Sequence, residues 1–411
     1  MPDKLNPGIA PTVLIADRET STSRPPAGLV LNEELGLLMH PALNGRLLHV
    51  NRHGGLFETR ATVTPGGDYL LMFPDCLPGK PHGHYGNRTE KVNELVAYRS
   101  PDRGETWHGP TVAFDIDYNQ HGFIPLIPRG TGRIYCFGTQ PIWGRWSGEE
   151  DAPIGYRWSD DDGHTWSDVK LIEPANAPGF LGMSVMRMCE TDAGTWLLGT
   201  HAGQWFDQPH GGRVPKTRQY ILRSTDQGES WTLLPGPRPA GWYVPEFDRM
   251  DELRPISLGG GEVYAQARTC EGHLWHLRSL DDGLTWSAPE PSPLVHPDTS
   301  PMLFHLSDGE TLIAFHHNVA TGTHFRCEDR AQVWVALSRD GGRTWGEPRF
   351  LLVNALAPAE GDGWRDYQCS YLDMFADDGQ LHIFMPHRWR RALHLRLSES
   401  DLEALPVGAD L

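Results

Sequence analysis

Short apolar stretches alternate with polar turns along almost the whole chain, and six of these stretches share one layout. Each reads as strand, tight turn, strand when the chain is aligned on six glycines: Gly67, Gly132, Gly194, Gly261, Gly309 and Gly379. Two examples are "TRATVTPGGDYLLMF" (59–73) and "LRPISLGGGEVYAQA" (253–267). Glycine reaches positive φ without steric cost, which suits the centre of a tight turn. The pattern therefore predicts six β-hairpins.

A second motif, Ser-x-Asp-x-Gly-x-Thr/Ser-Trp, follows each of the first five hairpins. It reads "SPDRGETW" (100–107), "SDDDGHTW" (159–166), "STDQGESW" (224–231), "SLDDGLTW" (279–286) and "SRDGGRTW" (338–345). The Ser and Asp side chains can bond turn amides, and the Trp offers an apolar plate between neighbouring units. Where the sixth copy should stand, "LRLSESD" (395–401) is degenerate. Self-similarity at a period of about 60 residues predicts a repeat fold.

Six such units predict an all-β fold, a six-bladed β-propeller of four-stranded antiparallel blades. We expect a single domain over residues 31–411 and a flexible leader over residues 1–30. The segment "LNGRLLHV" (43–50) is placed to supply the outer strand of the last blade and so close the ring. Two stacked β-sandwiches would be the alternative, but they would not need the motif at each step.

The repeated motif is similar to the Asp-box of the sialidase-like proteins, the neuraminidase or BNR-repeat superfamily. This resemblance implies a six-bladed propeller with the boxes on the outer, lower side of the blades, away from the active site. Binding proteins, hydrolases and lyases all carry such boxes. The motif thus indicates the fold, and function has to be argued from the site residues.

Composition narrows the classes of partner. A net charge of −17 argues against nucleic acid, because phosphate binding rests on a basic face. No apolar run approaches the ~20 residues of a membrane span, so we expect no membrane partner. The N-terminus lacks the features of a signal peptide, so we expect a cytoplasmic location, or a secreted or periplasmic one if a signal was removed. The six cysteines are widely spaced, which predicts buried free thiols.

Counting from the turn glycines selects the strand ends that would face the central channel. Glu58 and Glu252 stand nine residues before Gly67 and Gly261, and Arg60 and Arg254 follow two residues later on the same face. Further polar side chains occupy the other strand ends and adjoining loops: Asp75, His82, His84, His121, His201, Arg268 and Arg388. Titratable groups converging on one end of a ring predict a functional pocket.

The resemblance implies particular roles for some of these residues. Sialidases use three arginines to grip a sugar carboxylate, a Tyr nucleophile activated by a Glu, and an Asp acid/base. "DELRPISLGGGEVYAQAR" (251–268) resembles the stretch that holds the catalytic Glu and one of the arginines, so Glu252 and Arg268 take those positions. Arg330 stands where the third arginine would be. Tyr371 lies near the nucleophile position, with Tyr367 as the other candidate.

Two stretches depart from the family pattern. "FETRATV" (57–63) replaces the Phe/Tyr-Arg-Ile-Pro opening, and Arg60 is a loose substitute for its arginine. The loop that should carry the acid/base Asp, "PDCLPGKPHGHYGNRTEKVNE" (74–94), offers Asp75 with His82 and His84 instead.

Three functions follow as hypotheses. The first is an exo-acting glycoside hydrolase on a terminal acidic sugar, with Arg60, Arg268, Arg330, Glu58, His201, His82 and Arg388 binding substrate. Glu252 would activate Tyr371, and Asp75 or a histidine would be acid/base. The second is a uronate-specific lyase using His84, His121 and His201. The third is a non-catalytic glycan-binding propeller that stacks sugars on Trp143, Trp146, Trp205 and Trp242. We expect no cofactor and no metal, because the histidines lack ligand spacing and no phosphate loop or dinucleotide fingerprint occurs.

Overall fold

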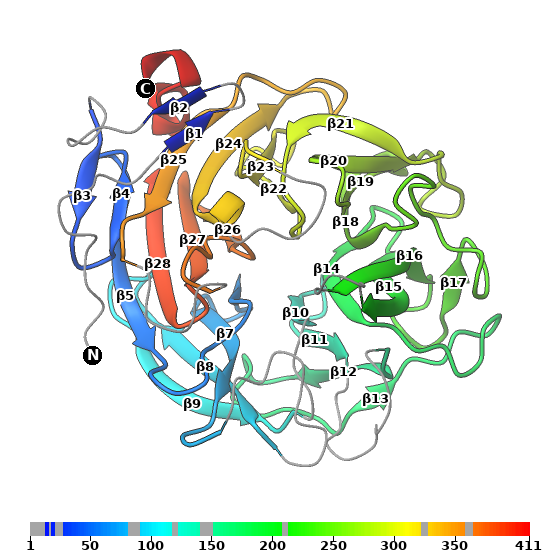
Figure 1. Ribbon diagram of the computed structural model, residues 1–411. Helices are drawn as coiled ribbons and strands as arrows, with labels where there is room; N and C mark the ends of the chain where they lie inside the picture. The colour runs from blue at the N-terminus through cyan, green and yellow to red at the C-terminus, as the bar shows by residue number, and fades with distance from the viewer. Residues whose placement is uncertain are drawn as a thin grey trace. The chain divides into compact units, whose positions relative to one another are not determined.

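The structure is a computed structural model that describes residues 13–15, 18–20, 28–80, 91–116, 122–139, 151–207, 213–321, 328–357 and 365–411. Apart from three short 3₁₀ helices, the regular structure of these residues is β-strand. The helices are η1 (Glu328–Arg330), η2 (Glu399–Ala404) and η3 (Gly408–Asp410). The predicted fold class is confirmed, because six antiparallel sheets, five with four strands and one extended to six, form the blades of a six-bladed β-propeller (Figure 1).

The chain divides into two compact units, and each is described by itself. The middle unit contains residues 51–268 and 275–291, and the terminal unit contains residues 1–50, 269–274 and 292–411. The predictions of a single domain over residues 31–411 and of a flexible leader over residues 1–30 stay predictions. Residues 1–12, 16–17 and 21–27 of that leader lie outside the described residues. Among the described residues, no helix has the length and apolar character of a membrane span.

The middle unit holds blades 1 to 3 and most of blade 4. Blade 1 consists of β6 (Arg60–Val63), β7 (Tyr69–Cys76), β8 (Asn93–Ser100) and β9 (His108–Phe114). Blade 2 consists of β10 (Gly122–Leu126), β11 (Ile134–Thr139), β12 (Ile154–Ser159) and β13 (Lys170–Leu171). Blade 3 consists of β14 (Ser184–Glu190), β15 (Trp196–Asp207), β16 (Arg213–Ser224) and β17 (Thr232–Leu234). Blade 4 consists of β18 (Asp251–Gly259), β19 (Glu262–Arg268), β20 (His273–Ser279) and β21 (Glu290–Val295).

The terminal unit holds blades 5 and 6. Blade 5 consists of β22 (Met302–His305), β23 (Leu312–His316), β24 (Gln332–Ser338) and β25 (Arg349–Asn354), and it is extended by β4 (Leu37–Met39) and β3 (Val30–Asn32). Blade 6 consists of β26 (Asp373–Asp377), β27 (Gln380–His387), β28 (Arg391–Ser398) and β5 (Asn44–Val50). A separate two-stranded sheet pairs β1 (Val13–Ile15) with β2 (Arg18–Thr20).

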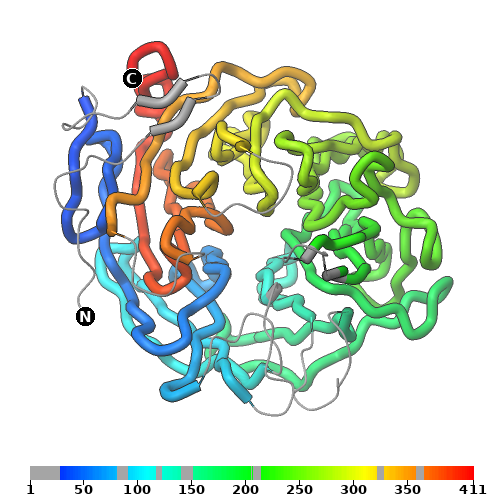
Figure 2. Tube along the Cα trace, viewed as in Figure 1, coloured from blue at the N-terminus to red at the C-terminus, as the bar shows by residue number. Residues whose placement is uncertain are grey.

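The outer strand of blade 6 comes from the N-terminal part of the chain, as the sequence predicts. Strand β5 runs antiparallel to β28, from Asn44 opposite Arg396 to Val50 opposite Arg391. Figure 2 shows this blue segment beside the red C-terminal strand. The extension of blade 5 by β4 and β3 has no counterpart in the sequence-based prediction, because three-residue strands carry too little periodicity to be recognised.

Each Asp-box folds into the same locally bonded turn. In the first box, Gly104 N–H donates to Ser100 Oγ at 2.7 Å, and Thr106 N–H donates to Asp102 Oδ1 at 2.7 Å. The glycine has φ 84 and the preceding Arg103 has φ 55, so two consecutive residues occupy the left-handed region. The equivalent bonds recur in the other four boxes. Hydrogen bonds within eight residues therefore define the turn without help from the rest of the chain.

The cores of the middle unit lie between successive blades, and the box tryptophans contribute to them. Trp231, at the end of the third box, is 3% exposed and belongs to an apolar cluster drawn from blades 2 and 3. Its ring lies 6.1 Å from that of Phe137 on β11. Trp166 contacts Phe114 at 5.3 Å in the same manner between blades 2 and 1. The prediction that each Trp wedges between neighbouring repeat units is confirmed at these boxes.

Candidate functional site

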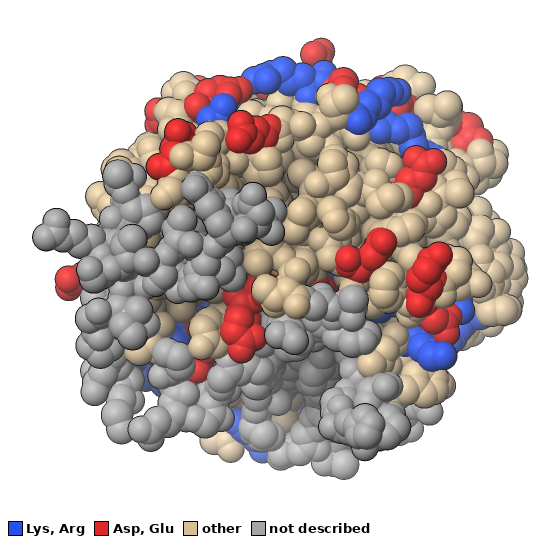
Figure 3. All heavy atoms as spheres, turned by 45° about the horizontal axis from the view of Figure 1, so that its top comes forward, with Lys and Arg blue, Asp and Glu red and all other residues tan. Residues whose placement is uncertain are grey.

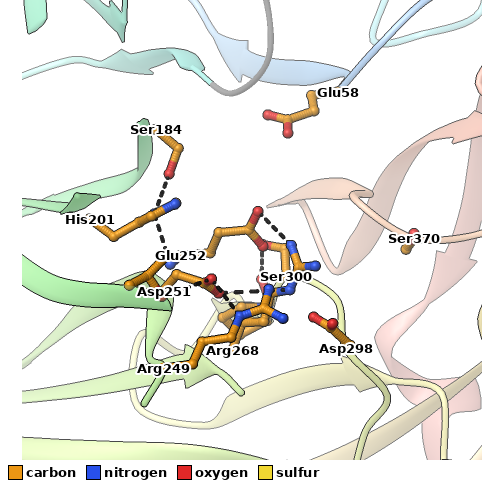
Figure 4. A network of polar contacts seen from close by, with 12 residues as sticks. Glu58, Ser184, His201, Arg249, Asp251, Glu252, Arg268, Asp298, Ser300 and Ser370 are labelled. Atoms are coloured by element: carbon orange, nitrogen blue, oxygen red, sulfur yellow. Dashed lines mark hydrogen bonds and ion pairs between the residues drawn. The ribbon is translucent and has the colours of Figure 1, made fainter. Parts of the chain in front are cut away.

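Two buried carboxylates and two buried arginines meet where β18 begins in the middle unit (Figure 4). Because β18 and β19 are antiparallel, the start of one opposes the end of the other, and Asp251 pairs with Arg268. Arg268 Nη1 donates to Glu252 Oε1 at 2.9 Å, while its Nε lies 3.7 Å from Asp251 Oδ1. Arg249 Nε donates to the other oxygen of Asp251 at 2.9 Å. The start of β18 and the end of β19, where the sequence places Glu252 and Arg268, therefore lie side by side, and the two side chains form an ion pair.

The backbone at Glu252 departs from regular strand geometry. The register of β18 against β19 shifts between Asp251 and Arg254, and Glu252 has φ 52. A bulge breaks the alternation of side chains, so counting residues along the strand no longer predicts which face each side chain occupies. A non-glycine residue held in the left-handed region costs of order 1 kcal/mol, and such residues concentrate at functional sites. Here the bulge accompanies the contact between Glu252 and Arg268.

The charges of this cluster balance. Arg249, Asp251, Glu252 and Arg268 contribute two positive and two negative charges, and each is less than 10% exposed. Removing one partner of a buried ion pair leaves an uncompensated charge, so the four side chains stabilise one another's ionised forms. The arrangement holds an arginine and a carboxylate in fixed positions, which is what electrostatic recognition of a charged ligand requires.

His201 lies at the edge of the same cluster, on β15. Its Nδ1 is 2.8 Å from Ser184 Oγ and 3.4 Å from the backbone N–H of Glu252. A backbone amide can only donate, so Nδ1 accepts, and the proton of the neutral ring is then on Nε2. Figure 4 shows the imidazole between Ser184 and Glu252. His201 is therefore held in one orientation and one tautomer.

Three other predicted residues, at or beside blade 1, form local contacts. Arg60 Nη2 donates to Glu58 Oε2 at 2.7 Å, and both side chains are almost fully buried. The two predicted residues therefore contact each other, although β6 begins at Arg60 and Glu58 lies before it. Asp75 ends β7 and accepts a hydrogen bond from Asn51 Nδ2 at 2.7 Å. Burial, with the nearby negative charge of Asp75, raises the pKa of Tyr98 to about 12.

The terminal unit brings Arg330 and Tyr371 together. Both are buried, and the guanidinium carbon of Arg330 lies 5.9 Å from the centroid of the Tyr371 ring. Arg330 Nη1 donates to Gln368 Oε1 at 3.3 Å, and its Nη2 donates to the carbonyl oxygen of Asp298. Tyr371 has φ 62 and lies just before Leu372 and strand β26. A second buried residue with left-handed backbone thus stands at the start of an inner strand.

Arg388, the last predicted arginine, is held by its own partners in the terminal unit. It forms a buried ion pair with Asp366, and its Nη1 donates to the carbonyl oxygen of Ala357 at 3.1 Å. Its backbone N–H donates to Gln368 O at 2.7 Å, so it adjoins the residue that also holds Arg330. These contacts place Arg388 close to the Arg330 group and give it a structural partner.

Sequence reasoning missed several members of these groups. They are Ser184, Arg249, Asp251, Asp298, Asp366 and Gln368. Asp251 could have been recognised from the sequence, because it adjoins Glu252. The others are single polar residues in loops or at strand ends, and no sequence pattern marks them. His82, His84 and His121, together with Trp143 and Trp146, lie outside the described residues. Within the described part of the chain, no three His, Cys, Asp or Glu side chains are grouped so as to hold a metal ion.

The chain has a net negative charge, but on the face drawn in Figure 3 the Asp and Glu side chains do not form one continuous patch. They lie interspersed with Lys and Arg side chains. Several charged side chains of the described residues are paired, as Arg133 is with Asp160 and Lys91 with Asp115.

Comparisons with known proteins agree with this fold. The family model of the BNR repeat-like domain matches residues 90–383. A xyloglucanase from Paenibacillus sp is 28% identical over 224 residues, which cover 51% of this chain and 20% of that protein. A sialidase from Paraclostridium sordellii is 24% identical over 257 residues, which cover 57% of this chain and 58% of that protein. The match thus spans less than two thirds of either relative's length.

Among solved structures, a Hadza microbial sialidase superimposes with a TM-score of 0.62 at 17% identity. The match covers 88% of this chain and 69% of that one. Likeness at this identity concerns the fold of the backbone, and chemistry has to come from the side chains described above.

Proposed function

The chain belongs to the BNR repeat-like family, and from that premise we propose that it is an exo-acting glycoside hydrolase that removes a terminal acidic sugar from a glycan. One observation carries the proposal. Glu252 and Arg268 form a buried ion pair of 2.9 Å at the strand end where the sialidase resemblance expects the catalytic Glu and a carboxylate-binding Arg. The sialidase among the relatives supports the same class of reaction.

Arg268 is the group we assign to the sugar carboxylate. A guanidinium offers a planar fork of donors that matches a carboxylate, and lysine cannot reproduce that geometry. Glu252 and Asp251 hold the guanidinium in place before any ligand arrives, so little conformational entropy is lost on binding.

Tyr371 is the group we assign to nucleophilic attack. Negative charge develops on a phenolic oxygen as it becomes a nucleophile, and the positive Arg330, 5.9 Å from the ring centroid, stabilises that charge. The role of Glu252 in activating Tyr371, and that of Asp75 or a histidine as acid/base, stay predictions.

One observation favours elimination from a uronate as a second candidate. His201 carries its proton on Nε2 when neutral, because Nδ1 accepts from Glu252 N–H. An imidazole held in this tautomer can donate an Nε2–H hydrogen bond to a uronate carboxylate, and elimination requires that the charge of this carboxylate be neutralised.

A paired assay tests these proposals. Oligosaccharides ending in sialic acid or in a uronic acid are incubated with the protein, and released sugar is followed beside the ultraviolet absorbance of an unsaturated uronate. Sugar release without new absorbance supports hydrolysis, and Glu252→Gln should then abolish it. Glu262→Gln is the matched control, because Glu262 pairs with Arg278 at 2.6 Å in the same blade.

The other outcomes contradict the hydrolase. New absorbance would favour elimination, and His201→Gln should then remove it while Tyr371→Phe retains it. If neither sugar release nor new absorbance is observed, but calorimetry detects glycan binding, the protein is a binding module. Tyr264 is a buried tyrosine of the middle unit, and Tyr264→Phe serves as the control for loss of a phenolic oxygen.

A further inference from the structure

The middle unit carries an exposed aromatic and cationic surface on the strands that extend beyond blade 3. Strands β15 and β16 pair from Trp196 opposite Ser224 to Asp207 opposite Arg213. Strand β14 accompanies β15 only as far as His201. The two central strands therefore continue past their sheet as a two-stranded ribbon, and the ribbon has faces that its own sheet does not cover.

One face of this ribbon carries a row of aromatic and charged side chains. Phe206 shares its face with Lys216 and Arg218, because Phe206 opposes Val214 and side chains alternate along β16. Lys216 Nζ lies 5.7 Å from the Phe206 ring centroid. The guanidinium carbon of Arg218 lies 3.7 Å from the ring centroid of Tyr243, in the loop that leads to β18. We call Phe206, Lys216, Arg218, Tyr243 and Asp248 the ribbon surface.

The charged members of the ribbon surface are held in place. Asp248 forms ion pairs with Lys216 at 3.1 Å and with Arg218. Arg218 Nη1 also donates to the carbonyl oxygen of Asp248 at 3.1 Å. The aromatic rings nevertheless stay open to solvent, with Phe206 42% and Tyr243 39% exposed. Exposed aromatic rings flanked by oriented polar groups are unfavourable on a surface that contacts only water, and they are typical of a surface that binds a ligand.

This combination fits the chemistry of a neutral sugar. The face of a pyranose ring is apolar and packs on an aromatic ring, while its hydroxyl groups need oriented donors and acceptors. Lys216 and Arg218 supply donors, and Asp248 supplies acceptors. Their charges sum to one positive, which is too little to select a polyanionic chain.

Strand β16 connects the ribbon surface to the Glu252 site, which lies against the opposite face of the strand. Thr217 lies between Lys216 and Arg218 in sequence and points to the opposite face. Its Oγ1 donates to Met250 O at 3.1 Å and lies 3.3 Å from Asp251 Oδ2. Asp251 in turn contacts Arg268, the partner of Glu252. One strand therefore carries the ribbon surface on one side and a contact with the charged cluster on the other.

We propose that the ribbon surface binds the neutral sugars that follow the terminal residue of the glycan, with pyranose rings packed on Phe206 and Tyr243. The inference rests on the proposed function, since it assigns the part of the glycan that the Glu252 site does not hold. It makes the protein selective for the oligosaccharide that carries the terminal sugar as well as for that sugar.

Kinetics on two substrates with one terminal sugar test this. The substrates are sialylated lacto-N-tetraose and the methylumbelliferyl glycoside of sialic acid. In the variant F206A/Y243A, KM for sialylated lacto-N-tetraose should rise about tenfold, the loss expected when two aromatic contacts disappear. KM and kcat for the methylumbelliferyl glycoside should not change. The control is Leu284→Ala, which removes another exposed apolar side chain of the middle unit. Equal changes for both substrates, or none, would overturn the proposal.

Calorimetry with neutral lacto-N-tetraose separates this proposal from the hydrolase. If the wild-type protein binds it, F206A/Y243A loses binding and Leu284→Ala retains it, the ribbon surface is a glycan site even where no hydrolysis occurs. If the protein hydrolyses the sialylated substrates but neither KM nor neutral binding responds to F206A/Y243A, the ribbon proposal fails and the hydrolase stands. Absence of both hydrolysis and neutral binding overturns both.

Discussion

The ion pair between Glu252 and Arg268 should be much more strongly coupled than a similar pair in the same blade. Its two side chains are 1% and 7% exposed and its donor–acceptor distance is 2.9 Å. The pair between Glu262 and Arg278 is as close, at 2.6 Å, but its side chains are 23% and 21% exposed. Distance and residue types are thus matched, and burial is the variable.

The magnitude follows from the charge balance of the cluster. At 2.9 Å with an effective dielectric constant of about 20, two unit charges attract by about 6 kcal/mol before desolvation is counted. Removing one partner of a buried pair typically costs about 3 to 5 kcal/mol. Asp251, 3.7 Å from Arg268, compensates part of the charge left by Glu252→Gln, so we expect about 3 kcal/mol for that variant.

A double-mutant cycle measures the coupling. The free energy of unfolding is determined in urea for the wild type, E252Q, R268M and the double variant, with tryptophan fluorescence as the probe. Asp251 and Arg249 still neutralise each other in the double variant, so it should recover stability relative to the sum of the single variants. We expect a coupling of about 2 kcal/mol here and below about 1 kcal/mol for Glu262 and Arg278. Equal coupling for the two pairs would refute the reasoning from burial.

Three further changes test the fold. Trp231→Ala should lower the free energy of unfolding by about 3 to 5 kcal/mol, because it leaves a cavity in the core between blades 2 and 3. Urea unfolding measures this loss, and a smaller loss would show that the ring is not part of that core. Hydrogen bonds from Thr106 lower the pKa of Asp102 to about 2 from 3.8, so the carboxylate stabilises the fold above about pH 4 and this contribution disappears toward pH 2. Asp102→Asn should therefore flatten the melting temperature between those pH values, and an unchanged acid profile would contradict the turn bonding. Burial lowers the pKa of His316 to about 4, so the unfolded chain binds a proton that the folded chain does not, and stability falls as the pH drops from about 6.5 to 4. His316→Gln should reduce the dependence of the free energy of unfolding on pH by about 1.4 kcal/mol per pH unit, as measured by urea unfolding at pH 7, 6 and 5. A pH dependence equal to that of the wild type would rule out a buried neutral ring.

The candidate site shows where reasoning from sequence succeeds and where it stops. Glu58 and Arg60 are two residues apart where blade 1 begins, and they form the contact that their spacing suggests, although only Arg60 lies within β6. At β18 a bulge between Asp251 and Arg254 interrupts the alternation, so the same count no longer predicts which side chains share a face. Arg330 and Tyr371 are distant in sequence, and their proximity depends on how blade 5 meets the loop before β26.

The sequence by itself determined the repeat, the hairpins and the Asp-box turns, because each is stabilised by hydrogen bonds and backbone preferences within a few residues. It also determined the class of fold, since six amphipathic units need one another's faces to bury their apolar side chains. Only the tertiary structure decided which carboxylate holds which arginine, and that β15 and β16 extend beyond their sheet with exposed rings. Those contacts join residues whose relative positions are set by bulges, strand lengths and packing, none of which has a local signal in the chain.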